Sequence, residues 1–153
     1  KYPKKTKIVA VVQGEDKIKA HLCAGLIRDL GYDKLCISYG ASWYGDTPLN
    51  KALGRINFVK ELLEDKRYKD TKFHLLGCAV PQEFGWYRNE PQIESIDTSS
   101  PIMAALEGTT YSKSGLLEKP IANMNTHFNI EPKKINYNKI LKNVKRFRTI
   151  NGL

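Results

Sequence analysis

The chain has 153 residues, enough for one compact domain, and its 41% hydrophobic and 27% charged residues are in the balance usual for soluble proteins. No apolar run comes near the ~20 residues that a membrane helix needs, which excludes a membrane-spanning protein. The formal net charge of +9 favours a polyanionic partner.

Strands and helices alternate along the first half of the sequence. Residues 7–12 form a continuous β-branched run, which is typical of a strand in a parallel sheet. A helix is expected over 15–30, a second strand over 34–38, a second helix over 52–68 and a third strand over 72–77. The first helix repeats large apolar residues at close to helical spacing: Ile18, Leu22, Leu26 and Leu30.

The alternation continues as far as residue 107 and then stops. A loop or short helix is expected over 81–87, a fourth strand over 93–96 and the start of a helix over 101–106. Residues 108–131 are rich in Thr, Ser, Gly and Asn, which indicates a long surface loop or extension. A basic helix is expected over 136–147. Its apolar side consists of Ile140, Leu141, Val144 and Phe147.

Strands that alternate with helices predict an α/β fold with a parallel sheet and right-handed crossovers. The periodicity leaves two architectures open: a small doubly wound domain, or parallel (β/α) units that form about half of a TIM-type barrel. Residues 1–107 are the expected (β/α) part. Residues 108–153 are an expected extension that ends in a basic C-terminal helix, within the same domain.

The cysteines give an expected compartment. Cys23, Cys36 and Cys78 are odd in number and contain no C-x-x-C pair. They indicate buried apolar thiols in a reducing cytoplasm rather than a disulfide framework. The first residue is Lys1 and not Met, which is expected of a fragment or a processed product.

Positive charge is concentrated near the end of the chain. Residues 133–148 contain lysines and arginines and no acid. Such a cluster attracts a polyanion and is typical of nucleic-acid binding, although a solvated, solubilising surface would have the same composition. The candidate contacts with a nucleic-acid backbone are Lys133, Lys134, Lys142, Lys145, Arg146 and Arg148.

Each expected strand ends in a polar or glycine-containing signature: Gln13-Gly14, Gly40-Ala41, Gly77 and Asp97. The carboxyl ends of parallel strands carry the reactive groups in barrels and doubly wound sheets alike. A Gln side chain both donates and accepts, which suits the edge of a purine, and glycines let backbone groups approach a flat ligand. The four signatures therefore predict one site at one edge of the sheet.

Asp97 is the candidate nucleophile of that site. A carboxylate at a strand end can attack the anomeric carbon of a sugar and form a covalent glycosyl intermediate. An Asp before Ser-Ser-Pro more often caps a helix. Its interpretation as a nucleophile therefore depends on the order of the other three signatures.

That order resembles the second half of tRNA-guanine transglycosylases and of their phage relatives that insert 7-deazaguanines into DNA. Those enzymes carry Val-Gln-Gly after one strand, here residues 12–14, and a glycine-rich strand end, here residues 39–41. A Leu-Met-Gly-Val-Gly-x-Pro-like segment follows, here residues 75–81, and then Phe-Asp-x-x-x-Pro, here residues 96–101. The resemblance covers about residues 7–107.

The resemblance implies a pentosyltransferase that exchanges guanine for a 7-deazaguanine in nucleic acid, without a cofactor. Gln13 and Gly14 would then read the base edge, and the backbone at Gly40 and Ala41 would contact its exocyclic groups. Leu76 and Gly77 would line the base slot. Asp97 would attack C1′ of a nucleotide that has been flipped out of its stack. The expected compartment is the cytoplasm, which for a phage enzyme is that of the host.

Three departures from the family pattern limit this interpretation. The family uses an upstream Asp on the first half of its barrel, and that half is not in the chain. The zinc-binding Cys-x-Cys-x-x-Cys…His pattern of the tRNA enzymes does not follow Asp97, so no metal is expected and DNA is favoured over tRNA. Tyr39 stands where the family has the first glycine of a pair, which implies an altered base slot.

Other functions stay open at this point. The chain would be a non-catalytic nucleic-acid-binding half-barrel if the second acid is missing altogether. It would be one subunit of a split enzyme if a second chain, or another copy of this one, completes the barrel, because a half-barrel exposes two sheet edges. A small doubly wound nucleotide-binding protein lacks support, since the sequence has no G-x-G-x-x-G or Walker loop.

Overall fold

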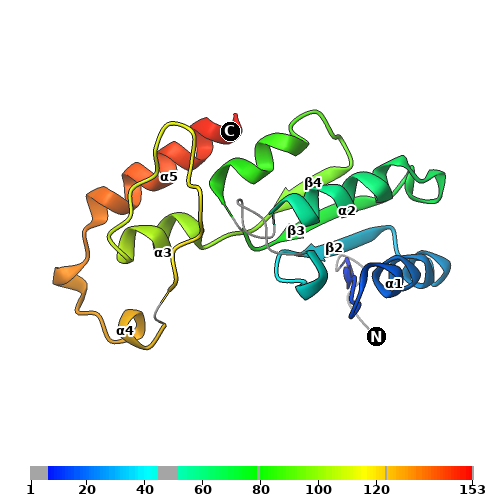
Figure 1. Cartoon of the computed structure of the whole chain (residues 1–153), viewed down its shortest axis with the longest axis horizontal. Helices are drawn as coiled ribbons and strands as arrows, with labels where there is room; N and C mark the ends of the chain where they lie inside the picture. Colours follow the sequence, from blue (N-terminus) through cyan, green and yellow to red (C-terminus); the bar gives the residue numbers. More distant parts are fainter. Residues whose placement is uncertain (1–6, 45–51, 79, 123, 153) are drawn as a thin grey trace.

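The computed structural model describes residues 7–44, 52–78, 80–122 and 124–152. Its centre is a four-stranded, all-parallel sheet in which the strands follow one another in sequence order (Figure 1). The strands are β1 (Ala10–Val11), β2 (Lys34–Ser38), β3 (Lys72–Leu76) and β4 (Ile93–Ile96). The predicted α/β class and parallel sheet are confirmed.

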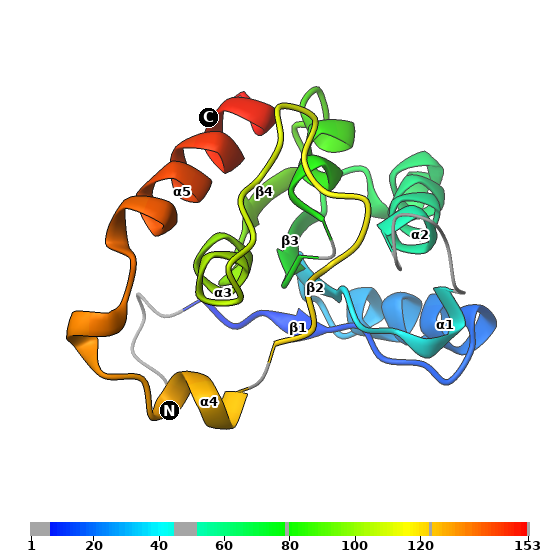
Figure 2. The same ribbon diagram turned by 60° about the vertical axis from the view of Figure 1, so that its left-hand side comes forward.

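Five α-helices and four 3-10 turns complete the described part of the chain. The α-helices are α1 (Lys17–Asp29), α2 (Ala52–Glu64), α3 (Ser100–Leu106), α4 (Met124–Phe128) and α5 (Tyr137–Asn151). The 3-10 turns are η1 (Ser42–Tyr44), η2 (Lys66–Tyr68), η3 (Pro81–Tyr87) and η4 (Pro132–Lys134). Helices α3, α4 and α5 form a group beyond the carboxyl ends of the strands, away from α1 and α2 (Figures 1 and 2).

Local sequence signals explain where helices α1 and α5 begin and end. Asp16 caps α1, because its carboxylate accepts the N–H of Lys19 at 2.8 Å, and Gly31 follows the helix with a φ of 87°. Asn136 caps α5 through the N–H of Lys139 at 3.0 Å, and Gly152 ends it in the left-handed conformation. Each helix therefore has a polar cap at its start and a glycine after its end.

The two faces of the sheet differ in chemistry. Leu35, Ile37, Phe73 and Leu75 are at most 1% exposed and belong to the hydrophobic core that α1 and α2 cover. Side chains alternate along a strand, so the residues between these point to the other face. We call that other face the polar face of the sheet; its members are Lys34, Cys36, His74, Ser95 and Asp97.

The first strand is shorter than predicted. Residues 7–12 were expected to form it, but only Ala10–Val11 pair as β1, with Leu35 and Cys36 of β2. β1 is an outer strand with a neighbour on one side, and Ile8 is 47% exposed. A β-branched run therefore predicts a strand correctly, but it does not predict how many of its residues pair with a neighbouring strand. The predicted helix over 52–68 divides into α2 and η2, because Asp65 caps a new turn through the N–H of Arg67.

The apolar repeat of α1 does not face the core. Ala20, Ala24 and Ile27 are the buried residues of this helix. The large side chains of the repeat form an exposed ridge, which we call the α1 ridge: Ile18 at 74%, Leu22 at 63%, Leu26 at 64% and Leu30 at 76% exposure. Small residues let α1 approach the sheet closely, and the large ones are left exposed. Exposed apolar residues gathered in this way indicate a surface that another element covers.

The last helix is buried largely on its predicted apolar side, since Phe147 is buried and Ile140 and Val144 are half-buried. Asn143, Phe147 and Asn151 are buried in α5, whereas Leu141 is 55% exposed. The predicted loop over 108–131 contains the short helix α4 and an isolated bridge between Ser112 and Gly115. In the part of the chain that the structure describes, no helix has the length and apolar character needed to cross a membrane.

Candidate functional site

Asp97 directly follows β4 and is anchored to the end of β3. Its backbone N–H donates to the carbonyl of Leu75 at 3.2 Å, and its carboxylate accepts the N–H of Gly77 at 2.9 Å. Gly77 has a φ of +68°, a conformation that favours glycine and turns its N–H toward the carboxylate. The side chain of Asp97 is 62% exposed. This residue is therefore a fixed, solvent-accessible carboxylate at the carboxyl edge of the sheet.

The helix-cap interpretation of Asp97 does not describe its contacts. The N-cap of α3 is Ser99, which makes no side-chain cap hydrogen bond, and Thr98 Oγ1 accepts the N–H of Ser100 at 2.9 Å. Asp97 instead contacts the neighbouring strand, as described above. The local sequence that favours a cap is thus overridden by a contact 20 residues away.

A histidine and a serine lie beside Asp97 on the polar face. Nδ1 of His74 is 2.8 Å from the hydroxyl of Ser95, its register partner on β4. Nε2 of His74 is 3.6 Å from Oδ1 of Asp97, which is outside hydrogen-bond distance but within the range of an ion pair when the ring is protonated. His74 was not among the site residues predicted from the sequence. Alternation along β3 places it on the polar face, but only the register with β4 reveals its neighbours.

The predicted base-binding residues of the first two strands do come together. Gln13, Gly14, Gly40 and Ala41 share the lining of one cavity of about 160 Å³ at the ends of β1 and β2. Gly14 is required there, since a Cβ at this position would lie 2.5 Å from the backbone nitrogen of Ala20. The cavity is smaller than the several hundred Å³ of typical ligand pockets. By itself it holds at most part of a nucleotide.

Gly77 lines a different cavity, next to Asp97. This space of about 190 Å³ lies between the end of β3, the start of α3 and the segment around Lys119. The ammonium of Lys119 is 4.4 Å from the centre of the Tyr39 ring, and the Tyr39 ring also lies 3.6 Å from where a Cβ of Gly77 would be. Tyr39 therefore fills part of the space between the two cavities, and burial raises its pKa.

Gln13 and Asp97 lie at opposite ends of this edge. They follow β1 and β4, the two outer strands, and three strand spacings separate these, roughly 14 Å. The structure thus gathers the predicted residues at one edge but in two groups, with Gln13 to Ala41 at one cavity and Gly77 with Asp97 at the other. Leu76 lies between them, half-buried at the end of β3.

A buried ion pair holds the strand ends in place, and sequence reasoning missed it. Arg55 of α2 and Glu83 of η3 are 2.6 Å apart and both 0% exposed. The guanidinium also donates to the carbonyls of Leu76 at 2.7 Å and Gly77 at 3.0 Å. Burial opposes the charge of Arg55, but the attraction of Glu83 outweighs it and raises the pKa of Arg55. Arg55 thereby fixes the carbonyls on either side of the turn whose N–H holds Asp97.

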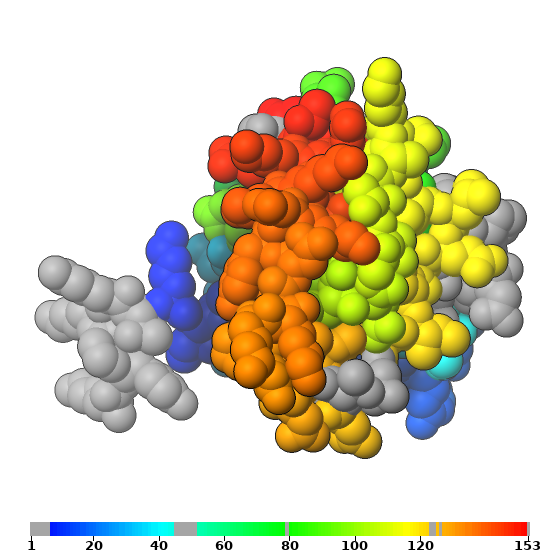
Figure 3. Space-filling view, turned by 90° about the vertical axis from the view of Figure 1, so that its left-hand side faces the viewer, coloured from blue at the N-terminus to red at the C-terminus, as the bar shows by residue number. Residues whose placement is uncertain are grey.

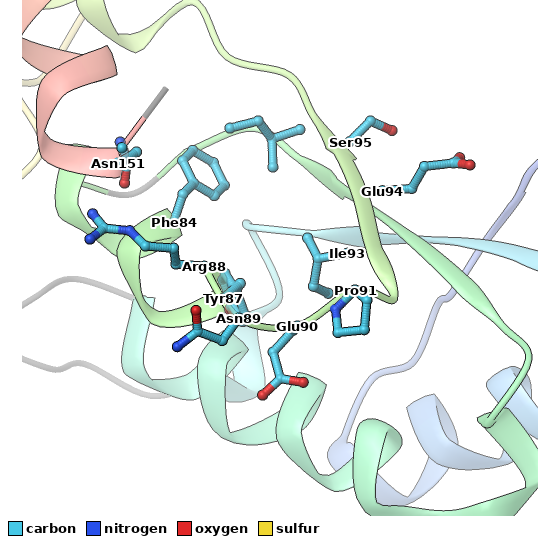
Figure 4. Close-up of a pocket in the computed structure, with 12 residues that line it drawn as sticks. Phe84, Tyr87, Arg88, Asn89, Glu90, Pro91, Ile93, Glu94, Ser95 and Asn151 are labelled. Carbon is cyan, nitrogen blue, oxygen red and sulfur yellow. The ribbon is translucent and has the colours of Figure 1, made fainter.

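A larger cavity, of about 600 Å³, shares Ser95 with the group around Asp97 but is otherwise lined by different residues (Figure 4). Phe84 and Tyr87 from η3, Ile93 from β4 and Asn151 from α5 contribute to its lining. It borders the outer side of β4, where no further strand is paired among the described residues. None of the predicted site residues lines it.

The predicted basic residues divide into three groups. Lys142, Lys145 and Arg146 line a shallow groove of about 490 Å³ along α5. Arg148 is exposed on the same helix but does not line the groove. The remaining pair, Lys133 and Lys134, lies in η4, and both ammonium groups are within 3.6 Å of the carboxylate of Glu131. Figure 3 shows α5 exposed along its length on this face of the molecule.

Comparison with known proteins adds no relative: no family model, no curated protein and no solved structure matches the chain. Among the described residues, no group of three or more His, Cys, Asp or Glu is placed to hold a metal ion.

Proposed function

We propose that the chain supplies the carboxyl-side half of a (β/α) barrel that exchanges guanine for a 7-deazaguanine in nucleic acid, DNA being favoured over tRNA. The observation that carries the proposal is the position of Asp97, an exposed carboxylate fixed to Gly77 at the edge where the other signatures also end. Consecutive parallel strands without a reversal of order support a barrel half, because a doubly wound sheet reverses its order at its ligand site.

The exchange would proceed in two displacements at the anomeric carbon. In the first, an oxygen of Asp97 forms a bond to C1′, and the guanine leaves with the electron pair of the C1′–N9 bond and takes up a proton. In the second, a nitrogen of the incoming 7-deazaguanine, having lost its proton, bonds to C1′ and the carboxylate leaves. The acid that protonates the departing base lies outside this half in the proposed enzyme.

The base would bind to groups at the carboxyl ends of the strands and to the two small cavities beside them. The amide of Gln13 would pair with the edge of the base, and Gly40 and Ala41 would offer backbone groups. Because Gln13 and Asp97 lie on the outer strands, the base between them must also touch the missing half. The two small cavities are consistent with that requirement.

The nucleic-acid backbone would lie along α5. Lys142, Lys145 and Arg146 present three cations to one groove, which suits successive phosphates and carries no sequence information. Lys133 and Lys134 would contribute less, since Glu131 already neutralises part of their charge. Arg148 would add a contact outside the groove.

The test is exchange of labelled guanine into DNA and tRNA by the complete protein, with denaturing gels to detect a covalent adduct. Asp97→Asn is expected to abolish both the adduct and the exchange, because an amide is a poor nucleophile. Asp70→Asn is the matched control, since Asp70 is 77% exposed and remote from the edge. Exchange by the Asp97 variant at the unmodified rate would overturn the proposal.

A non-catalytic nucleic-acid-binding half-barrel is the second candidate, favoured by the separation of Gln13 from Asp97. It predicts salt-sensitive binding without exchange, lost when Lys142, Lys145 and Arg146 are changed to Gln. The slope of the logarithm of the binding constant against the logarithm of the salt concentration would become shallower by about 0.9 for each phosphate contact removed. Binding with exchange supports the first candidate, and binding without exchange supports the second.

Both candidate functions involve a partner that completes the barrel. The outer edges of β1 and β4, which pair with no further strand among the described residues, and the exposed α1 ridge favour a second chain, or another copy of this one, in a split enzyme. The mass of the native complex distinguishes the two partners. The cytoplasm, of the host cell for a phage protein, is the proposed compartment, where nucleic acid is available and thiols stay reduced.

A further inference from the structure

The polar face of the sheet places one ionisable ring directly against the proposed nucleophile. His74 and Ser95 are register partners on β3 and β4, and Asp97 lies two residues beyond Ser95 on the same face. Such diagonal neighbours across two strands are within reach of an aromatic side chain. His74 is 20% exposed in its side chain, so the ring is accessible to solvent; it is held at Nδ1 by Ser95, and its Nε2 faces Asp97.

The hydroxyl of Ser95 determines which form of the ring suits Asp97. A hydroxyl can donate or accept, and it lies 2.8 Å from Nδ1. When Ser95 donates to Nδ1, the neutral ring carries its proton on Nε2, which faces Asp97 at 3.6 Å. Hydrogen bonds of this kind are often long in a ligand-free site and shorten when substrate binds.

The other charged or titratable groups around His74 largely neutralise one another. Lys34 of β2 and Glu94 of β4 form an ion pair across this face, and the hydrogen bond from Lys34 lowers the pKa of Glu94. Cys36, the register partner of His74 on β2, is buried, and burial raises the pKa of its thiol, so that it stays uncharged. Lys72, on the same strand, donates to the carbonyl of Pro91. Asp97, at 3.6 Å from Nε2, is the carboxylate that lies against the ring.

The chemistry favours a neutral ring. Attack on C1′ neutralises the carboxylate, and positive charge develops on the sugar in the transition state. An imidazolium would stabilise the reactant carboxylate and repel the developing cation, so it would lower the rate. A neutral Nε2–H would orient the same carboxylate without that cost.

We propose that His74 is a positioning residue for Asp97: the neutral ring, fixed by Ser95 at Nδ1, directs Nε2–H to the carboxylate and aims it at the sugar. The inference rests on the proposed function and names the group that orients its nucleophile. Protonation of His74 then slows the first displacement, and deprotonation restores it. The site should therefore work best above the range in which this histidine is charged.

One experiment tests the contact between His74 and Asp97 without measuring base exchange. NMR titration of the three histidines in the full chain is compared between the unmodified protein and Asp97→Asn. The ring signals of His74 are expected to change in Asp97→Asn, because the substitution removes the carboxylate that lies 3.6 Å from Nε2. The ring signals of His21 and His127, which contact Glu61 and Glu107, are internal controls and should not change. Unchanged His74 signals overturn the inference and leave the proposed function standing.

A second experiment measures the rate of adduct formation against pH in the complete protein, with labelled guanine and a guanine-containing DNA duplex as probes. The unmodified protein should gain about tenfold between pH 5.5 and pH 8, and His74→Gln, which keeps a donor without a charge, should lack the step that histidine titration causes. His74→Phe should lose about tenfold at pH 8, because it keeps the ring shape and removes the donor.

The outcomes separate the two proposals. A pH step that persists in His74→Gln, or an unchanged rate in His74→Phe, overturns the role of His74 while the exchange itself stands. No adduct with the unmodified protein overturns the proposed function, and with it any role of His74 in the reaction. The circular dichroism spectra of both variants should match that of the unmodified protein, which shows that a loss of rate is not caused by unfolding.

Discussion

The buried pair of Arg55 and Glu83 gives a stability prediction that can be worked out from its contacts. Glu83→Gln keeps the shape of the side chain and removes its charge, so a buried guanidinium loses its counter-ion. Both side chains are 0% exposed and 2.6 Å apart, and Arg55 donates to two strand-end carbonyls as well. Removing one partner of such a pair costs about 3–5 kcal/mol, out of a free energy of unfolding of about 5–15 kcal/mol. For 153 residues this lowers the melting temperature by about 9–16 °C.

Urea unfolding followed by far-ultraviolet circular dichroism measures the change. Glu15→Gln is the control, because Glu15 pairs with Lys19 on the surface with 83% of its side chain exposed and should contribute less than about 1 kcal/mol. The destabilisation by Glu83→Gln should also persist at 0.5 M salt, since buried charges are screened little. If both variants unfold at the same urea concentration, carbonyl groups alone hold Arg55 and the ion pair does not stabilise the fold.

Two further predictions concern the cysteines and the α1 ridge. Iodoacetamide at pH 8 should modify the half-buried Cys23 and spare Cys78 in the folded protein. Burial raises the pKa of Cys78 to about 12, so that roughly one Cys78 thiol in ten thousand is ionised at this pH. Mass spectrometry of the labelled peptides checks this prediction, and equal labelling of both cysteines would contradict it. Changing Leu22 and Leu26 together to Lys should leave the free energy of unfolding nearly unchanged, since both are more than 60% exposed, whereas Ala24→Lys on the buried side should prevent folding. Urea unfolding distinguishes these variants, and a large loss in the double leucine variant would show that the ridge is packed within the chain.

Much of the fold could be predicted because its signals are local. The strand over 34–38, the strand over 93–96 and the turn over 81–87 have the predicted bounds, since short apolar stretches and flanking turn residues define them. The pairing of residues 7–12 could not be predicted, because the length of a ladder depends on its neighbour. The buried side of α1 was also unpredictable from periodicity, since alanines and leucines alternate around the helix and packing decides between them.

The site was predictable only as a set of strand ends. Asp97, Gln13 and Gly40 were located by their positions after strands, and all three lie at the predicted edge. Arg55 was not found, because an arginine within an amphipathic helix gives no sign that it will reach strand carbonyls. His74 was not found as a neighbour of Asp97 because their contact depends on a register shift between β3 and β4.

The contrast between the two faces of the sheet indicates where function lies. A parallel sheet that is covered on both sides has apolar residues on both faces. Here one face is apolar, with Leu35 and Phe73 fully buried, while the other carries His74 and Asp97. Polar groups placed on a sheet face in this way need water or a partner. Because β1 and β4 also have no outer neighbour among the described strands, the element that covers this face must bring polar groups with it. Under the proposed function, a partner that completes the sheet would also complete the chemistry around Asp97.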